Sequence, residues 1–117
     1  MYKNYVDLLK HILDECKYIE SVITDDVSKN SFVEDETLKR AVVRSLEIIG
    51  EATKKIPADV KYKWQEIQWR NMAGMRGKLI HDYFGINYSI VWDVIKNKIP
   101  DLTKQIENII QKEDVEK

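Results

Sequence analysis

The chain has 117 residues, of which 44% are hydrophobic and 33% charged, with only four glycines and two prolines. This balance is typical of a globular, helix-rich protein and excludes a disordered or fibrous one. The length predicts a single domain over residues 1–117 with one core. The formal net charge is −1, so the field of the whole molecule does not attract nucleic acid.

Cellular location follows from what the sequence lacks. No apolar run approaches the roughly 20 residues that cross a bilayer, and the first residues do not form a secretory signal. The single cysteine, Cys16, excludes an internal disulfide and a multi-cysteine metal cluster, which agrees with a reducing compartment. We therefore expect a cytoplasmic protein without a membrane partner.

The first half of the chain predicts two long helices. Apolar residues recur at spacings of three and four through Ile23, as on an amphipathic helix. The polar stretch 24–30 predicts a connection. Ser31 with Glu34 three residues later predicts a capping box at the start of a second helix. Pro57 is expected to end that helix.

Four further helical segments are predicted after Pro57. A short turn over residues 58–64 leads into a third main helix over residues 69–83, which Gly85 is placed to terminate. Asn87 is expected to cap the next helix through its side chain. Pro100 suits the first turn of a final helix.

The expected architecture is all-α. Residues 112–117 are predicted to fray, and no segment shows the period-two alternation of a half-buried strand. These elements predict an up-and-down bundle of four to five helices.

Several conspicuous residues are best interpreted as structural. We expect His11 to be a surface residue and Cys16 a small buried hydrophobe. Gly50 lowers helix stability by about 1 kcal/mol relative to alanine, which indicates a close approach of a neighbouring helix. The sequence contains no glycine-rich phosphate loop and no serine-centred elbow. The three tryptophans are predicted to be core or interface anchors: Trp64, Trp69 and Trp92.

Basic residues are concentrated in one region. Between Lys54 and Lys78 there are seven lysines and arginines against two acidic residues. This local surplus permits a polyanion site, although a solvated helix surface explains it at least as well.

The segment from Arg76 to Tyr83 concentrates the reactive side chains. It combines the permanent cation of Arg76, the near-neutral titration of His81 and the phenol of Tyr83, beside Lys78 and Asp82. On a regular helix Arg76 and Tyr83 nearly coincide in direction, whereas His81 lies about 140° from Arg76. Either the helix ends near His81, or a second copy of the chain completes the site across a two-fold axis.

These groups suit cleavage of an RNA phosphodiester. His81 would take a proton from the ribose hydroxyl or protonate the leaving oxygen, while Arg76 would stabilise charge on the phosphoryl oxygens. This chemistry requires neither a metal ion nor another cofactor. A histidine and an arginine that simply face solvent are the competing interpretation.

A family resemblance supports the catalytic interpretation. It rests on Glu47–Ala52, Trp69–Arg76, Leu79–Gly85, Trp92 and Ile99–Leu102. The arrangement of arginine, four residues, histidine, one residue and tyrosine within this longer pattern is specific. The chain resembles the HepT family of HEPN-domain toxins nearly from end to end.

This resemblance implies a homodimeric bundle with a metal-free RNA-cleaving site at the subunit interface. Arg76 and His81 take the catalytic positions of the family motif. Tyr83 takes the position of the tyrosine that an MntA-type nucleotidyltransferase antitoxin modifies with AMP. Lys78, Asp82 and Arg70 are assigned a supporting or RNA-binding part. The expected function is that of the toxin of a type II toxin–antitoxin pair.

Two other interpretations remain open. Family members often carry asparagine directly after the motif arginine, whereas this chain has Gly77. This difference bears on catalytic strength more than on the fold. In one alternative, the domain is a non-catalytic module that binds nucleotide or the nucleotidyltransferase, with Tyr83 only as the AMP acceptor. Alternatively, it is a structural helical dimer in which Arg76 and Asp82 make only ion pairs.

Overall fold

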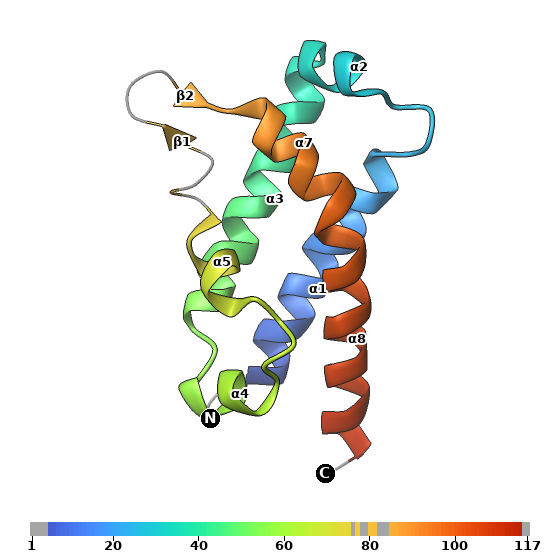
Figure 1. The fold of residues 1–117 in the computed structure, drawn as a ribbon. Helices are drawn as coiled ribbons and strands as arrows, with labels where there is room; N and C mark the ends of the chain where they lie inside the picture. Colours follow the sequence, from blue (N-terminus) through green and yellow to red (C-terminus); the bar gives the residue numbers. More distant parts are fainter. Residues whose placement is uncertain (1–4, 76, 78–79, 82–84, 116–117) are drawn as a thin grey trace.

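The structure is a computed structural model that describes residues 5–75, 77, 80–81 and 85–115, with only the backbone at 80–81 and 114–115. The described residues form helices and one short antiparallel hairpin (Figure 1). This confirms the predicted all-α class. The elements are α1 (Tyr5–Val22), α2 (Lys29–Glu34), α3 (Glu36–Lys54), α4 (Ala58–Lys63), α5 (Trp69–Ala73), β1 (Ile80–His81), β2 (Gly85–Ile86), α7 (Tyr88–Asn97) and α8 (Ile99–Val115).

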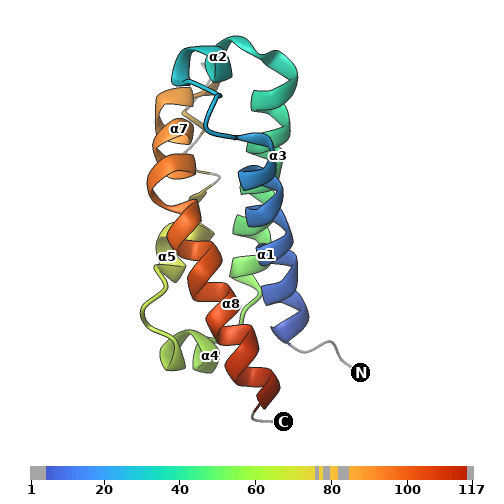
Figure 2. The same cartoon turned by 90° about the vertical axis from the view of Figure 1, so that its right-hand side faces the viewer.

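Three long helices form the body of the molecule. Helix α1 packs against both α3 and α8, and α5 packs against α3. Figure 2 shows α1 and α3 on one side of the molecule and α7, α5 and α4 on the other, with α8 running between them. The first turn of α1, the last turn of α8 and α4 share one end, while α2 and the hairpin lie toward the opposite end (Figure 1).

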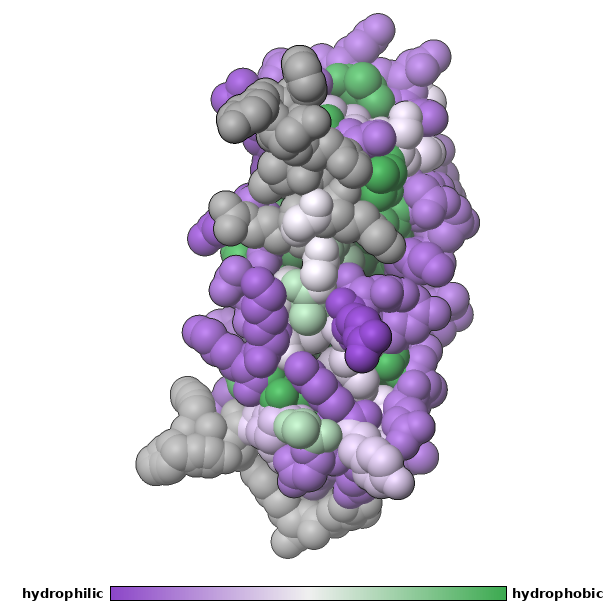
Figure 3. All heavy atoms as spheres, turned by 60° about the vertical axis from the view of Figure 1, so that its left-hand side comes forward, coloured by the Kyte–Doolittle hydropathy of each residue, from purple (hydrophilic) through white to green (hydrophobic). Residues whose placement is uncertain are grey.

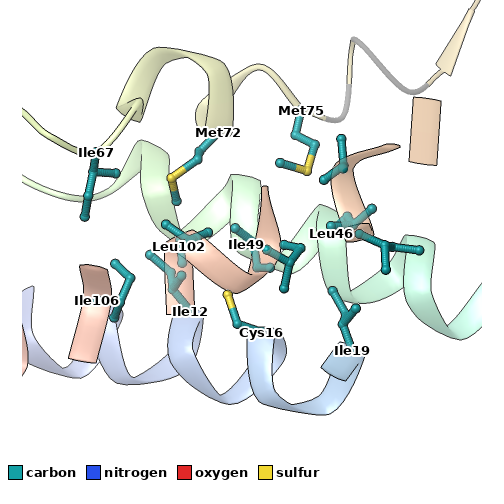
Figure 4. Packing of buried hydrophobic residues seen from close by; sticks show 14 of the residues in the cluster. Ile12, Cys16, Ile19, Leu46, Ile49, Ile67, Met72, Met75, Leu102 and Ile106 are labelled. Carbon is teal, nitrogen blue, oxygen red and sulfur yellow. The ribbon is translucent and has the colours of Figure 1, made fainter. Parts of the chain in front are cut away.

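The core fills the space between these helices. Its apolar side chains come from the helical stripes seen in the sequence, which are buried because each helix turns one face inward. Figure 4 shows part of this cluster, with α1 and α3 supplying opposite walls. The fully buried members include Leu9, Ile12, Ile19, Leu46, Ile49, Ile99, Ile106 and Ile109.

The predicted second helix is two helices. The capping box forms one turn earlier than expected, where the Ser31 N–H donates to Ser28 Oγ at 3.1 Å and the Ser28 N–H donates to Ser31 Oγ at 2.9 Å. The chain then breaks at Asp35, whose carboxylate accepts a hydrogen bond from the Leu38 N–H at 3.0 Å and caps α3. The predicted capping box of Ser31 and Glu34 was therefore wrong, because Ser31 takes the N3 position of the box that Ser28 begins, and Asp35 caps the next helix.

The predicted third main helix is also shorter than expected. Helix α5 ends at Ala73, where the Gly74 N–H bonds to the Arg70 carbonyl at 3.0 Å, and residues 80–81 are extended. Two glycines within four positions weaken a helix by about 1 kcal/mol each, and isoleucine and aromatic residues favour strands. A continuous helix over residues 69–83 was therefore wrong.

The later helix boundaries were predicted better. Asn87 Oδ1 accepts hydrogen bonds from the Ser89 and Ile90 N–H groups at 3.0 and 3.2 Å, which confirms the cap of α7. Pro100 lies in the first turn of α8, also as predicted. However, α8 continues to Val115, so the expected fraying from residue 112 was wrong over this part. No helix in the described ranges is long and apolar enough to cross a membrane.

Candidate functional site

The reactive segment lies between two well-anchored parts of the fold. Arg76, Lys78, Asp82 and Tyr83 are outside the described residues, and for His81 only the backbone is described. What the structure shows is how the chain enters and leaves this segment.

The entry is fixed by α5 and Met75. A Cβ atom built on Gly50 of α3 would lie 3.2 Å from the Met72 carbonyl oxygen, so α3 and α5 approach very closely. This confirms the close approach predicted from Gly50. Trp69 Nε1 donates to the Trp64 carbonyl at 2.9 Å, while Met72 and Met75 point into the core (Figure 4). The residue directly before Arg76 is therefore buried and held.

The exit is a short hairpin. Strands β1 and β2 pair antiparallel, with Ile80 opposite Ile86 and His81 opposite Gly85. Gly85 has a φ of +92°, which residues with a Cβ rarely adopt. The pairing fixes the backbone of His81 against Gly85, rather than on a helix face. The helical angle between Arg76 and His81 used in the sequence argument therefore does not apply.

The chain after the hairpin is anchored again at Tyr88. Its ring lies edge-on to Phe32, with centroids 6.3 Å apart, and Lys39 Nζ lies 4.6 Å from its centroid. Phe32 is fully buried, so this contact ties the start of α7 to the core. Residues 76–84 thus begin and end at fixed points.

Among the predicted site residues, only Arg70 has a described side chain, and it is exposed on α5. The grouping of Arg76, His81 and Tyr83 therefore remains a prediction. Within the described ranges, no three His, Cys, Asp or Glu side chains lie close enough together to hold a metal ion.

The residues interpreted as structural behave as expected. His11 is exposed. Cys16 is fully buried, and burial raises the pKa of its thiol to about 12, so it is a poor nucleophile. Trp64 and Trp69 are buried core residues, and the partly buried Trp92 packs on Phe32 with ring centroids 5.5 Å apart.

The sequence argument missed one polar cluster. Glu113 in α8 is 9% exposed and accepts hydrogen bonds from the Tyr5 hydroxyl, Lys63 Nζ at 3.2 Å and Trp64 Nε1 at 3.1 Å. The Tyr5 hydrogen bond, followed by those of Lys63 and Trp64, lowers the pKa of Glu113 although burial opposes the shift. The only signal in the sequence is the apolar periodicity of the last helix, which places residue 113 four positions after the buried Ile109.

A groove runs beside α5, next to the reactive segment. Its two pockets, of about 130 and 150 Å³, share Gln68, Met72, Met75 and Lys98. Three carboxylates line these pockets, namely Glu66, Asp93 and Asp101. The groove is therefore apolar at its floor and carries more negative than positive charge.

Comparison with known proteins identifies the family. Residues 12–109 match the family model described as HepT-like, "Ribonuclease HepT-like". A protein of Caldanaerobacter subterraneus subsp. tengcongensis named "Putative RNase" is 50% identical over 90% of this chain and 93% of its own length. A Methanocaldococcus jannaschii protein of the same description is 44% identical over 90% of this chain and 83% of its own. The "Probable ribonuclease HepT" of Thermococcus cleftensis is 41% identical over 93% and 98%, respectively.

No solved structure matches the chain. The family model, however, spans most of the chain and agrees with the resemblance seen in the motifs. The chain therefore belongs to the HepT-like ribonuclease family.

Proposed function

We propose that the chain is the toxin of a type II toxin–antitoxin pair, a metal-independent endoribonuclease that acts as a homodimer. The observation that carries this proposal is the arginine, four residues, histidine, one residue, tyrosine pattern in a chain that belongs to the HepT-like ribonuclease family. The anchored ends of residues 76–84 support it, because a catalytic segment needs fixed supports.

The proposed chemistry uses Arg76 and His81. The imidazole of His81 removes the proton from the ribose 2′-hydroxyl or donates a proton to the leaving 5′-oxygen, and Arg76 stabilises the charge on the phosphoryl oxygens. Side chains from both protomers form the catalytic site, which lies at the two-fold axis of the homodimer. In this scheme, none of the described residues binds a metal ion.

Silencing of the toxin would occur at Tyr83. An MntA-type nucleotidyltransferase partner would attach one or more AMP groups to its hydroxyl. Each AMP adds bulk and a negative phosphodiester beside Arg76, which opposes the approach of an RNA phosphate.

The test is cleavage of labelled total RNA by purified protein in the presence of chelator, after mass measurement shows Tyr83 to be free of AMP. We expect His81→Ala to lower the cleavage rate by about 10²–10⁴-fold, the usual contribution of a general acid or base. Fold and dimeric mass are compared for both proteins as a control. Absence of cleavage by the wild type would favour the non-catalytic binding module.

A further inference from the structure

Tyr62 presents its ring to solvent from α4. Val60 of this helix and Trp64, which follows its last residue, are buried, at 6% and 8% exposure, because they face the core. Tyr62 lies two positions from each, which places it about 200° around the helix, on the outer face. At 78% it is the more exposed of two large exposed hydrophobic residues in the described part, the other being Tyr18 at 41%.

Lysines lie near Tyr62 along the chain. Lys61 and Lys63 flank it on α4, and Lys55 follows the last residue of α3, before the connection to α4. Lys112 of α8 lies on the same end, since its Nζ is 5.7 Å from the centroid of the Trp64 ring. We call this surface the α4 patch; it consists of Lys55, Lys61, Tyr62, Lys63 and Lys112.

The charge of the α4 patch favours an anionic partner. In the described part, no carboxylate lies within 4.0 Å of Lys55, Lys61 or Lys112, so no ion pair there neutralises these three charges. Lys63 pairs with the buried Glu113 at 3.2 Å, and Asp59 is an exposed acid on α4. The patch therefore retains a positive surplus, in contrast to the groove beside α5 with its three carboxylates.

The α4 patch also lies along the chain from the reactive segment. Helix α5, with the exposed Arg70, connects α4 to Met75 and Arg76 (Figure 1). Figure 3 shows a largely hydrophilic face on this side of the molecule. The exposed Arg70 therefore offers a cation between the α4 patch and the reactive segment.

We propose that the α4 patch binds single-stranded RNA, with one base stacked on Tyr62 and neighbouring phosphates on the lysines. Single-strand binding sites combine an aromatic platform, which accepts any base, with cations that follow the backbone. The inference rests on the proposed function for its assignment to the RNA substrate. It adds a second contact, remote from the cleaved bond.

Binding is measured separately from cleavage. Fluorescence anisotropy is recorded with His81→Ala protein and unstructured RNAs of about 4 and about 16 nucleotides, the range of single-strand site sizes. We expect an added Tyr62→Ala change to weaken binding of the longer RNA about tenfold, as loss of one stacked base does. Tyr62→Phe retains the ring and keeps the affinity, and Tyr18→Ala is the matched control for loss of an exposed tyrosine.

The lysines are tested by salt. Each phosphate contact contributes about 0.7 to the slope of log K against log salt for single strands, so Lys61→Gln should reduce that slope by about this amount. Tyr18 and Tyr62 are exposed and Lys61 is half-buried. The unfolding midpoint of each variant is therefore compared with that of the parent, so that loss of the fold is distinguished from loss of RNA binding.

The outcomes separate this inference from the proposed function. If wild type cleaves RNA and Tyr62→Ala binds the long RNA as tightly as its parent, the α4 patch is not an RNA site and the function stands. If Tyr62→Ala instead reduces binding of the nucleotidyltransferase, the patch is a protein surface and the inference is overturned. Tyr62-dependent RNA binding in a protein that cleaves nothing would support the patch and contradict the ribonuclease.

Discussion

Two glycines of the chain stand in opposite surroundings. A Cβ on Gly50 would meet the Met72 carbonyl at 3.2 Å, which is backbone and cannot move without shifting α5. A Cβ on Gly77 would meet nothing within 4 Å among the described residues. The first glycine is required by packing, whereas no described atom constrains the second.

We therefore expect valine to act differently at the two positions. Gly50→Val forces its side chain against α5 and should lower the free energy of unfolding by about 1–3 kcal/mol, as overpacking does. Gly77→Val is exposed and should change it by less than about 0.5 kcal/mol. Urea unfolding of both variants checks this. Equal losses at the two sites would show that the approach of α5 does not constrain position 50.

Residue chemistry also explains what the sequence could predict of the site. The pattern from Arg76 to Tyr83 selects the reactive types because few histidines and arginines compete with it. The pattern does not predict the contacts that anchor the chain on either side of this segment. Phe32 and Tyr88, for example, are 56 positions apart in the sequence and come together only when the chain folds. The burial of Met75 likewise depends on contacts with distant helices.

At the scale of elements, the sequence predicted the helix boundaries that are set by the side chain at the boundary itself. Asn87 and Pro100 mark helix starts through their own side chains, so both were found. The hairpin was missed because β1 and β2 have two residues each, too few for a period-two pattern. The last turns of α8 were missed because Glu113 is held by Tyr5 of α1 and Lys63 of α4.

The Glu113 cluster connects three elements and gives a pH-dependent prediction. Its carboxylate has a lowered pKa in the folded protein, so its stabilising effect is complete above the unfolded value of about 4.3 and is lost as pH falls through the folded pKa. Glu113→Gln should therefore lower the free energy of unfolding by about 1–3 kcal/mol at neutral pH. The difference from wild type should shrink in acid.

A matched control for this change lies on the same helix. Glu107 makes an exposed ion pair with Lys17 at 3.4 Å, and such pairs contribute about 0–1 kcal/mol. Chemical unfolding of Glu107→Gln and Glu113→Gln is compared at neutral pH and near pH 3. A Glu113 effect that is no larger than that of Glu107, or that persists in acid, would contradict the assigned role of the cluster.

At the scale of the whole molecule, the apolar stripes and the small number of glycines predicted the bundle. Each stripe needs a partner face, and helices α1, α3 and α8 provide these faces to one another. What the stripes do not specify is which helices become neighbours. The structure shows that α1, α3 and α8 share one core: Cys16 of α1 lies in the same buried cluster as residues of α3 and α8.

This position makes Cys16 a reporter for the unfolding of the bundle. Its folded pKa of about 12 exceeds the unfolded value of about 8.5, so ionisation of the thiol favours the unfolded chain once pH rises above the unfolded value. Between these values the free energy of unfolding should fall by up to about 1.4 kcal/mol per pH unit through this group. The loss is a property of the whole fold, because a thiol with no exposed surface ionises freely only when the packed helices separate.

The measurement is urea unfolding of wild type and Cys16→Ala between neutral pH and about pH 10. All other titratable groups are common to both proteins, so the difference between the two slopes isolates the thiol. Cys16→Ala is expected to be less stable at neutral pH, because it leaves a small cavity, yet to lose less stability as pH rises. Parallel slopes would mean that the thiol reaches water in the folded protein, and that α1 opens without the rest of the bundle.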